Sequence, residues 1–392
     1  MADNLPIVFL PGIMGSRLYF PNSEKYWDPD NVLRMSEWIP VPLRSPDKLR
    51  KQMSFLEPAV VVSDDPNDRG WSGVPASFYT DFLGNLQARF PNAPVYAIGY
   101  DWRQDNWSTA DAVVAKIQEI LAHEHATQVQ VVTHSMGGLV FRAALAKTKG
   151  TAQPLAALVK GVVHVFQPVY GAVVLYRRLF TGVQVPGLDG EVTLHDVGGT
   201  LSNLAFAWIL GDNAIDFTGK VSGMPGAMQL VPSNSFPPPP WNQSFSGANG
   251  QTIYDMYRNP PTPPSVLVNG ISDEVRADML ARLAEVAPFY DQISGVKHDR
   301  TWTVVGGGLK TDTMIAFNGN NPQATQAANG GDGTVPLPSG AGLLSDPPVP
   351  FDPEKAIGDP CQFLVEGVAH ANAFAKAVPN VQSMVMQIVG AI

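Results

Sequence analysis

The chain has 392 residues, of which 45% are hydrophobic and 16% are charged, and its formal net charge is −9 at pH 7. This length is enough to bury a large core, whereas the excess of acidic residues excludes a nucleic-acid partner, because phosphate binding needs a basic face. No run of 18 consecutive apolar residues occurs, so no segment is predicted to span a membrane.

The first residues, Met1–Pro6, lead into an apolar run without the basic and apolar regions of a signal peptide. Cys361 is the single cysteine, so no disulfide can form within the chain, and this fits a reducing compartment. We therefore expect a cytoplasmic protein, or a secreted one whose signal is absent from this sequence, with Cys361 in the core. The seven histidines show no metal-ligand spacing, so neither a metal nor a cofactor is predicted.

Short apolar runs rich in β-branched residues alternate along the chain with longer runs of helical periodicity. Apolar strands alternating with helices are typical of a parallel sheet covered on both faces, so the predicted fold class is α/β with a mostly parallel sheet. The predicted strands are Ile7–Leu10, Val95–Ile98, Val129–Thr133, Val159–Val165, Thr301–Gly306 and Cys361–Val365, and the predicted helices between and after them are Thr109–His123, Gly137–Ala146 and Val381–Ile392.

Two long segments, residues 20–75 and 166–296, interrupt this alternation. Long ordered insertions in compact domains are usually functional. The alternative is that these two segments only pack against the core and have no further role. We therefore predict a core formed by residues 1–165 and 297–392, with an inserted subdomain at 20–75 and a cap or lid at 166–296.

The two insertions differ in composition. The first contains Trp27 and Trp38 among many prolines and aspartates. The second contains the proline-rich run 236–241 and a segment, Ser272–Val286, that is predicted to be a helix because acidic residues occupy its first turn.

A strand, a sharp turn and a helix are predicted around Ser135. The segment reads Val131-Val132-Thr133-His134-Ser135-Met136-Gly137-Gly138, and a helix-compatible apolar run follows it. In a nucleophile elbow such a turn holds the serine at the head of a helix, where free N–H groups favour developing negative charge. Thr133 stands where the pattern usually has glycine, and a serine that only caps the helix is the alternative interpretation.

An acid and a base for Ser135 occur later in the chain, in the order serine, aspartate, histidine that enzymes with this elbow show. His370 follows the predicted strand Cys361–Val365, and a loop after a late strand is where the base is expected. Asp332 lies in the run Gly330-Gly331-Asp332-Gly333, which leaves its carboxylate free of helix or strand duties.

Two alternatives to this pair stay open. An ordinary Asp-Gly turn would account for Asp332 without chemistry, and His298 with Asp299 would supply another histidine and aspartate. His164 falls inside an apolar strand, where a core histidine is expected.

Several short motifs stand in register across most of the chain: residues 7–18, Gly99-Tyr100-Asp101-Trp102-Arg103, the Ser135 elbow, residues 225–232, the Gly-Asp-Gly-Thr-Val run at Asp332, and His370. Together they make the sequence resemble the lecithin:cholesterol acyltransferase-like family of α/β-hydrolases, which includes lysosomal phospholipases. The resemblance implies an α/β-hydrolase fold with a cap insertion. One departure is at Gln167 and Tyr170, where the family often has a segment similar to Gly-x-Pro-x-x-Gly.

The predicted roles follow from where charge develops during acyl transfer. Ser135 would attack the carbonyl, His370 would take and return its proton, and Asp332 would orient His370. The oxyanion hole needs two donors: the elbow supplies the amide of Met136, and the resemblance implies the amide of Ile13.

Residues just beyond strand ends are candidates for the substrate pocket, because ligands of open parallel sheets bind at the carboxyl ends of the strands. Tyr100, Gln167 and Tyr170 meet this condition and are predicted to contact substrate. Similar insertions in the family contact lipid, so Trp27 and Trp38 would face a membrane surface through the first insertion; burial in the core is the alternative.

The predicted activity is that of a serine hydrolase, an esterase or lipase that cleaves a carboxylic ester through an acyl-enzyme, with acyl transfer to an alcohol as a further outcome. The resemblance favours a lipid ester as the partner, and a small-molecule ester fits the same residues. Amides, lactones and thioesters are alternative substrates for the triad. A non-catalytic binding protein on this fold is the alternative of a different class.

Overall fold

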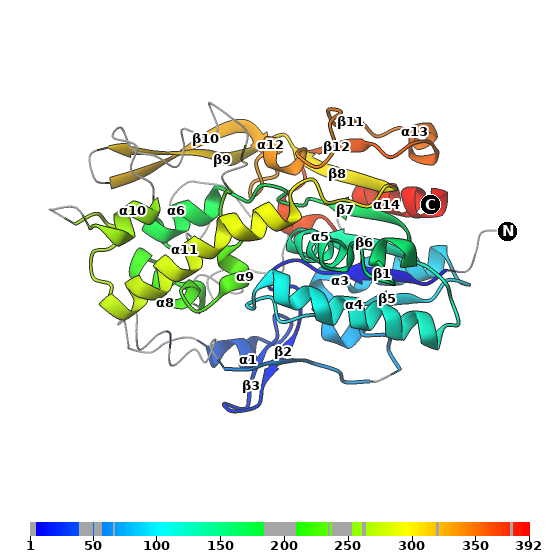
Figure 1. Cartoon of the computed structure of the whole chain (residues 1–392), viewed down its shortest axis with the longest axis horizontal. Helices are drawn as coiled ribbons and strands as arrows, with labels where there is room; N and C mark the ends of the chain where they lie inside the picture. Colours follow the sequence, from blue (N-terminus) through cyan, green and yellow to red (C-terminus); the bar gives the residue numbers. More distant parts are fainter. Residues whose placement is uncertain are drawn as a thin grey trace.

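The computed structural model places a parallel sheet at the centre, with helices on both faces and a further group of helices beyond one end of the strands (Figure 1). The residues that the structure describes are 5–38, 50, 57–65, 67–183, 209–233, 236, 253–260, 264–318, 321–376 and 379–392.

The central sheet contains seven strands in this described part of the chain, and each pairs in parallel with its neighbours. This arrangement confirms the predicted α/β class with a mostly parallel sheet. All six predicted strands are present, with ends that differ by at most one residue. In spatial order the strands are β11 (Val349–Pro350), β12 (Gln362–Glu366), β8 (Thr301–Gly307), β7 (Val159–Val165), β6 (Val129–His134), β1 (Ile7–Leu10) and β5 (Val95–Ala97).

Alternate residues of each central strand face opposite helical layers, because successive side chains point to opposite faces of a sheet. Ile7 and Phe9 of β1 pack into one apolar cluster, and Val8 and Leu10 pack into the other. The first cluster contains α3 (Ala76–Arg89) and α14 (Pro379–Ala391), and the second contains α4 (Asn106–His123), α5 (Met136–Thr148) and α11 (Asp273–Ile293).

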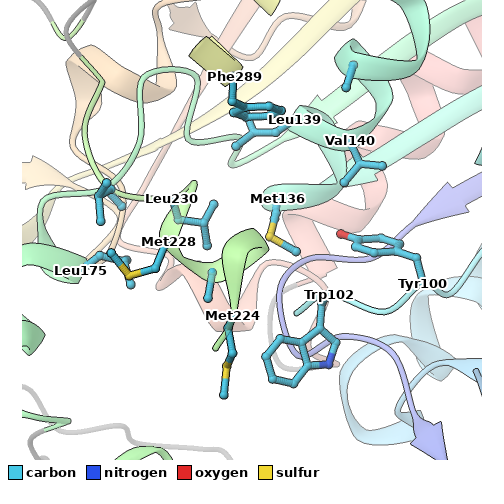
Figure 2. Packing of buried hydrophobic residues seen from close by; sticks show 14 of the residues in the cluster. Tyr100, Trp102, Met136, Leu139, Val140, Leu175, Met224, Met228, Leu230 and Phe289 are labelled. Carbon is cyan, nitrogen blue, oxygen red and sulfur yellow. The ribbon is translucent and has the colours of Figure 1, made fainter. Parts of the chain in front are cut away.

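Beyond the carboxyl ends of the strands lies a group of helices drawn from the second insertion (Figure 1). Figure 2 shows its apolar side chains Met228, Leu230 and Phe289 close to Met136 and Leu139 of α5, so this group packs directly onto the helix that follows Ser135. The proline-rich run predicted at 237–241 lies outside the described residues. The helices are α6 (Val174–Thr181), α8 (Ala214–Val221), α9 (Pro225–Met228), α10 (Ile253–Arg258) and α11.

Helix α11 extends beyond its predicted end at Val286. Ser272 caps it, with its Oγ accepting a hydrogen bond from the amide of Val275 at 3.2 Å, and the helix continues through Pro288. Phe289, Tyr290 and Ile293 beyond that proline are buried, so their packing offsets the hydrogen bond that proline removes. Among the described helices none combines the length and the apolar character that crossing a membrane requires.

A long antiparallel hairpin follows β8 and was not predicted from the sequence. Strand β9 (Leu309–Asn318) pairs with β10 (Asn321–Gly331), and the hairpin contacts α6 of the cap region. After the hairpin the chain returns to the end of β8, where α12 (Leu337–Gly340) begins. The hairpin therefore brings Asp332 back to the carboxyl end of the sheet.

The first insertion forms a small three-stranded sheet rather than a lipid-facing surface of tryptophans. Trp27 and Trp38 are 0% and 1% exposed, and their Nε1 atoms donate to backbone carbonyls of Met14 and Tyr26. The expectation that these two side chains face a membrane was wrong, because their rings pack into the main apolar cluster. The elements are β2 (Leu18–Phe20), β3 (Lys25–Trp27), α1 (Val32–Ser36) and β4 (Val60–Val61), and the insertion ends in the turn η1 (Trp71–Gly73).

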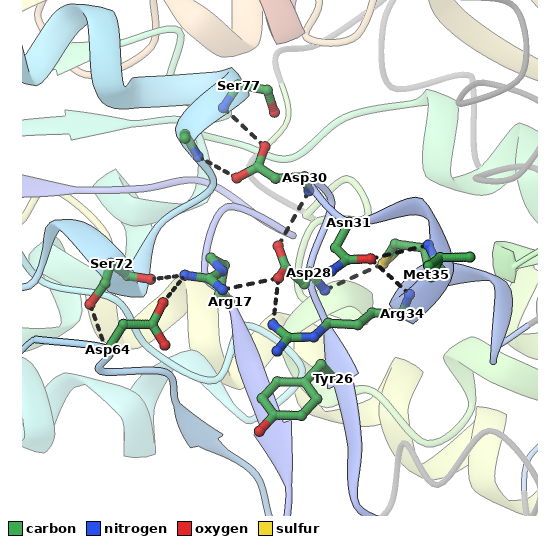
Figure 3. A network of polar contacts seen from close by, with 12 residues as sticks. Arg17, Tyr26, Asp28, Asp30, Asn31, Arg34, Met35, Asp64, Ser72 and Ser77 are labelled. Atoms are coloured by element: carbon green, nitrogen blue, oxygen red, sulfur yellow. Dashed lines mark hydrogen bonds and ion pairs between the residues drawn. The ribbon is translucent and has the colours of Figure 1, made fainter.

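A polar network ties this insertion to the core (Figure 3). The buried carboxylate of Asp28 receives Arg17 at 3.0 Å and Arg34 at 2.9 Å, and Arg17 also reaches Asp64 at 2.8 Å. Asp30 accepts hydrogen bonds from the amides of the first two residues of α3. Helix α3 has no side-chain cap of its own, so the insertion supplies the cap from a distant part of the sequence.

Candidate active site

Ser135 occupies the sharp turn between β6 and α5. Its φ is 51°, a left-handed value that is strained for a residue with a side chain. Glycines make room for the turn: a Cβ on Gly137 would lie 2.5 Å from the carbonyl oxygen of Pro11, and one on Gly12 would lie 2.9 Å from Cβ of Ser135. The serine does not cap α5 with its own side chain, so its hydroxyl is available for another partner.

Thr133 fits this turn because its side chain turns toward the neighbouring strand. Its Oγ1 lies 2.7 Å from Nδ1 of His164, which is directly opposite in the β6–β7 register. His164 is fully buried, and burial lowers its pKa to about 3, so it is a neutral core histidine as predicted. The close approach that glycine would allow at position 133 is provided by Gly137 and Gly138 instead.

Ser135, His370 and Asp332 form one hydrogen-bonded chain. Oγ of Ser135 lies 2.7 Å from Nε2 of His370, and Nδ1 of His370 lies 2.8 Å from Oδ2 of Asp332. Because the carboxylate only accepts, Nδ1 carries the proton, and Nε2 is left to accept from the serine hydroxyl. The structure thus brings together the three residues predicted as nucleophile, base and acid.

The loop around Asp332 holds that carboxylate in place. Its Oδ1 accepts from the amides of Thr334 at 2.9 Å and Val335 at 2.6 Å, and its side chain is 1% exposed. Its backbone oxygen accepts from the amide of His370 at 3.0 Å, so acid and base are also linked through the main chain. A Cβ on Gly306 would lie 2.5 Å from Cβ of Asp332, so only glycine at the end of β8 lets the returning loop reach this position.

Two buried side chains connect this chain of residues to the loop after β1. The amide of Gly12 donates to Oη of Tyr79 at 3.2 Å, and Tyr79 lies 2.9 Å from Nδ1 of His134. Nε2 of His134 lies 3.2 Å from the backbone oxygen of His370. Because that carbonyl only accepts, Nε2 of His134 is the donor and its Nδ1 accepts from the Tyr79 hydroxyl. Burial lowers the pKa of His134 to about 3, which keeps it neutral.

The two amides predicted for the oxyanion hole are positioned around Ser135. Met136 begins α5 directly after Ser135, and Ile13 follows Gly12, which contacts the serine. Within the described residues neither amide has an acceptor. The loop itself is held by Tyr100, whose hydroxyl donates to the Pro11 carbonyl at 2.7 Å.

The residues predicted to bind substrate lie in three different surroundings. Gln167 is buried against Gly138, and its amide atoms have no partner among the described residues. Tyr170 donates to the carbonyl of Gly342 at 2.9 Å beside a small cavity of about 130 Å³. Tyr100 lines a cavity of about 510 Å³ at the outer edge of β5. Neither of these cavities is lined by Ser135, so they do not mark the reaction site, and contact of these residues with substrate stays a prediction.

Apolar side chains from the second insertion and from the core surround Met136, the residue that follows Ser135 in the elbow. Figure 2 shows Met224, Met228 and Leu230 of the cap region and Trp102 of the core gathered around it. Ser135 is itself buried.

The alternative acid and base lie elsewhere. Nε2 of His298 donates to the carbonyl of Ala156 at 3.2 Å, and its Nδ1 accepts from the amide of Arg300 at 3.1 Å, near the start of β8. Strand β8 runs from that end toward the site, so His298 is at the opposite end of the sheet from Ser135. Cys361 is partly exposed rather than a full core residue.

Comparison with known proteins bears on the family and the fold. Residues 78–200 match the model of the lecithin:cholesterol acyltransferase family, so the predicted resemblance to that family is confirmed. The matched stretch includes Tyr79 and the Ser135 elbow and ends before Asp332 and His370. No curated protein sequence matches the chain.

Among solved structures, the crystal structure of the Tle4-Tli4 complex contains a chain with a TM-score of 0.66 and 19% identity, and the match covers 98% of both chains. This likeness confirms the α/β-hydrolase fold. Bacillus licheniformis lipase BlEst2 in its mature form gives a TM-score of 0.36 at 11% identity, over 98% of this chain and 93% of that one. Staphylococcus hyicus lipase gives 0.29 at 12% identity, over 99% and 93%.

Sequence reasoning did not find the positioning pair formed by Tyr79 and His134. His134 lies within the elbow motif itself, where a polar residue between the strand and the nucleophile is a usable signal. Tyr79 carries no such signal, because its partners Gly12 and His134 are 67 and 55 positions away.

Proposed function

We propose that the protein is a serine hydrolase that cleaves a carboxylic ester through an acyl-enzyme. The observation that carries this proposal is the hydrogen-bonded chain from Ser135 through His370 to Asp332 at a strained strand–helix turn. The family match and the fold support a lipase- or esterase-type hydrolase. A binding protein would have no need of a serine held at positive φ with its hydroxyl against Nε2 of a histidine.

The mechanism follows from these contacts. Ser135 Oγ attacks the carbonyl carbon while Nε2 of His370 takes its proton, and Asp332 stabilises the resulting imidazolium. The amides of Met136 and Ile13 donate to the oxyanion, each contributing about 3 kcal/mol of transition-state stabilisation. His370 then protonates the leaving alcohol, and water or another alcohol attacks the acyl-enzyme to release the acid or a new ester.

The substrate we propose is an ester with an apolar acyl chain, a lipid ester in the first place. Met224 and Met228 lie near Met136, the residue after the nucleophile, and unbranched thioether side chains adapt to ligands of varied shape. Thioesters, lactones and amides fit the same catalytic residues, and nothing in the described residues favours one of them.

A panel of esters of graded acyl length, assayed with and without an alcohol acceptor, tests this proposal. We expect kcat/KM to rise with acyl length until the chain fills the apolar surroundings, and product analysis by mass spectrometry to report acyl transfer. Absence of turnover on every ester, together with no acyl-enzyme adduct, would contradict the proposed class.

The Tyr79→Phe variant is expected to lower kcat on the order of ten- to a hundredfold with little change in KM. The change removes the acceptor of the Gly12 amide and the donor to His134 while keeping the ring. Both the oxyanion loop and the backbone of His370 would then be less well positioned, and the oxyanion contact forms fully only in the transition state.

The matched control is Tyr96→Phe, because the Tyr96 hydroxyl contacts Glu124 away from the site. A His134→Gln variant should retain more activity than His134→Ala, since a glutamine amide can both accept and donate. An equal loss in Tyr79→Phe and Tyr96→Phe, or a loss confined to KM, would show that the pair does not position the reacting groups.

A further inference from the structure

Phe166 is a bulky residue in a strained backbone conformation directly after β7. Its φ is 53°, a left-handed value that is rare for a side chain of this size, and the residue is 1% exposed. The register of β6 and β7 pairs His134 with Val165, and the carbonyl of Val165 accepts from the amide of Ser135 at 2.9 Å. Phe166 and Ser135 therefore follow the ends of two neighbouring strands, both at positive φ. Strain of this kind persists only where the surrounding structure imposes it.

The turn changes the face of the sheet on which the Phe166 ring lies. Side chains of an extended strand alternate between the two faces, so Phe166 would share the face of Val162, which packs with α4, α5 and α11. Its ring instead belongs to the other apolar cluster, together with Val163 and Val165 of the same strand. That cluster also contains residues on both sides of His370. The positive φ therefore places the ring on the face where the proposed base lies.

The ring of Phe166 faces the imidazole of His370. The two ring centroids are 6.1 Å apart with 33° between the ring planes, within the range in which aromatic pairs prefer a defined geometry. A Cβ on Gly306 would lie 3.2 Å from two carbons of the Phe166 ring and 2.5 Å from Cβ of Asp332, so the ring also reaches the strand end beside the acid. The amide of Phe166 donates to the carbonyl of Val304 at 2.8 Å, which fixes the backbone that carries the ring.

The base needs support that does not come from the nucleophile. His370 begins a short turn after β12, and its Nε2 can accept from Oγ of Ser135 only while that oxygen carries a proton. In an acyl-enzyme Oγ is part of an ester, and among the described residues the imidazole then keeps one side-chain hydrogen bond, to Asp332. Rotation of the imidazole about that contact would move Nε2 away from an attacking water. The rings of His134, at 5.3 Å, and of Phe166 restrict this rotation.

We propose that Phe166 is a positioning residue that keeps the imidazole of His370 directed at the acyl group during hydrolysis of the acyl-enzyme. This role rests on the proposed function. In that step water adds its oxygen to the acyl carbon and gives a proton to Nε2. The bond from that carbon to Oγ of Ser135 then breaks, and Nε2 returns the proton to Oγ as the acid is released. Both proton transfers need Nε2 in place, and Phe166 orients it without touching the reacting atoms.

The test is the Phe166→Leu variant of the full chain, treated with 4-nitrophenyl dimethylcarbamate. Leucine keeps apolar bulk and the strain of positive φ but removes the planar ring. Nitrophenolate release gives the rate of carbamoylation and the number of active sites, and recovery of activity after removal of the reagent gives the rate of decarbamoylation. We expect the number of sites to stay the same, carbamoylation to fall by less than about threefold, and decarbamoylation to fall roughly tenfold, because small misplacements of a catalytic group are costly.

Phe141→Leu serves as the comparison. Phe141 is a fully buried phenylalanine of α5 whose ring lies 6.2 Å from that of His164, a histidine outside the proposed triad. This variant should lose stability in thermal unfolding and keep both rates per active site. If Phe166→Leu does not fold, Phe166→Met, with an unbranched side chain that adapts to its surroundings, makes the same comparison.

Three results would overturn this role for Phe166 and leave it a packing residue: an unchanged rate of decarbamoylation, an equal loss in Phe141→Leu, or a loss confined to the number of active sites. A failure of the proposed function gives a different result, because the parent chain itself would then not be carbamoylated at Ser135, and both proposals would fall together.

Discussion

Replacing Ser135 with alanine is expected to lower kcat by about a millionfold, the size of loss seen when a serine nucleophile of this kind is removed. The fold should survive, because the Ser135 side chain does not cap α5 and, among the described residues, the only hydrogen-bond partner of its Oγ is His370. Turnover of an activated ester and labelling by a fluorophosphonate, followed by mass spectrometry, measure the two consequences. One adduct on Ser135 is expected in the parent chain and none in the variant.

A matched control is Ser233→Ala. Ser233 is a buried serine in the cap region whose hydroxyl has no partner among the described residues. Its loss should leave labelling and turnover within about twofold, as expected of a side chain outside the reacting groups. Stoichiometric labelling that persists in Ser135→Ala would place the nucleophile elsewhere and remove the basis of the proposed mechanism.

The second large effect is expected for the base. His370→Ala should lose nearly as much rate as Ser135→Ala, because members of such a triad act as a unit. Asp332→Asn should lose about ten-thousandfold or less. The oxygen that accepts from the amides of Thr334 and Val335 must stay a carbonyl, so the NH2 group of asparagine would face Nδ1 of His370 and donate to it, and the imidazole adopts the wrong tautomer. The measurement is single-turnover acylation across the pH range.

His298 offers the control for this prediction. It is a buried histidine at the opposite end of the sheet, where its Nε2 donates to the carbonyl of Ala156 and its Nδ1 accepts from the amide of Arg300. The variant His298→Asn should keep the rate of acylation even if its Tm falls. A crippled His298→Asn or Asp299→Asn beside an active His370→Ala would reverse the assignment of acid and base.

Much of the core was predictable because residues close together in the sequence determine its strands and helices. Ile7–Leu10 is a continuous apolar run and Val159–Val165 is mostly valine and almost wholly buried, as expected of parallel strands covered on both faces. The Ser135 elbow joins one such run to a helix within a few residues. For the same reason the predicted strand ends differ from the observed ones by no more than a residue.

The hairpin β9–β10 was not predictable in this way. Strand β10 is rich in alanine, asparagine and glutamine, which are not typical of strands, and it is held by its pairing with β9 and by contact with α6. The start of α3 depends on Asp30, 46 positions earlier, rather than on a cap in its own sequence. Tertiary contacts decide both elements.

The same distinction applies to the site. Ser135, Asp332 and His370 could be selected because each stands in a short motif of recognisable chemistry. Tyr79 could not, since a tyrosine with helical neighbours reads as core until its hydroxyl is seen between Gly12 and His134. The positions of Trp27 and Trp38 were ambiguous for a related reason. The composition around a tryptophan does not show whether its ring is buried in the core or exposed to a membrane.

The place of β12 in the sheet determines when, during synthesis, the chain can form the proposed triad. The strand lies between β11 and β8, and the base that follows it is 235 positions from the nucleophile. A growing chain on the ribosome therefore carries Ser135 long before it carries His370. On the proposed mechanism the serine lacks its base until β12 has been made and has entered the sheet, so a chain that stops before His370 holds an unactivated hydroxyl.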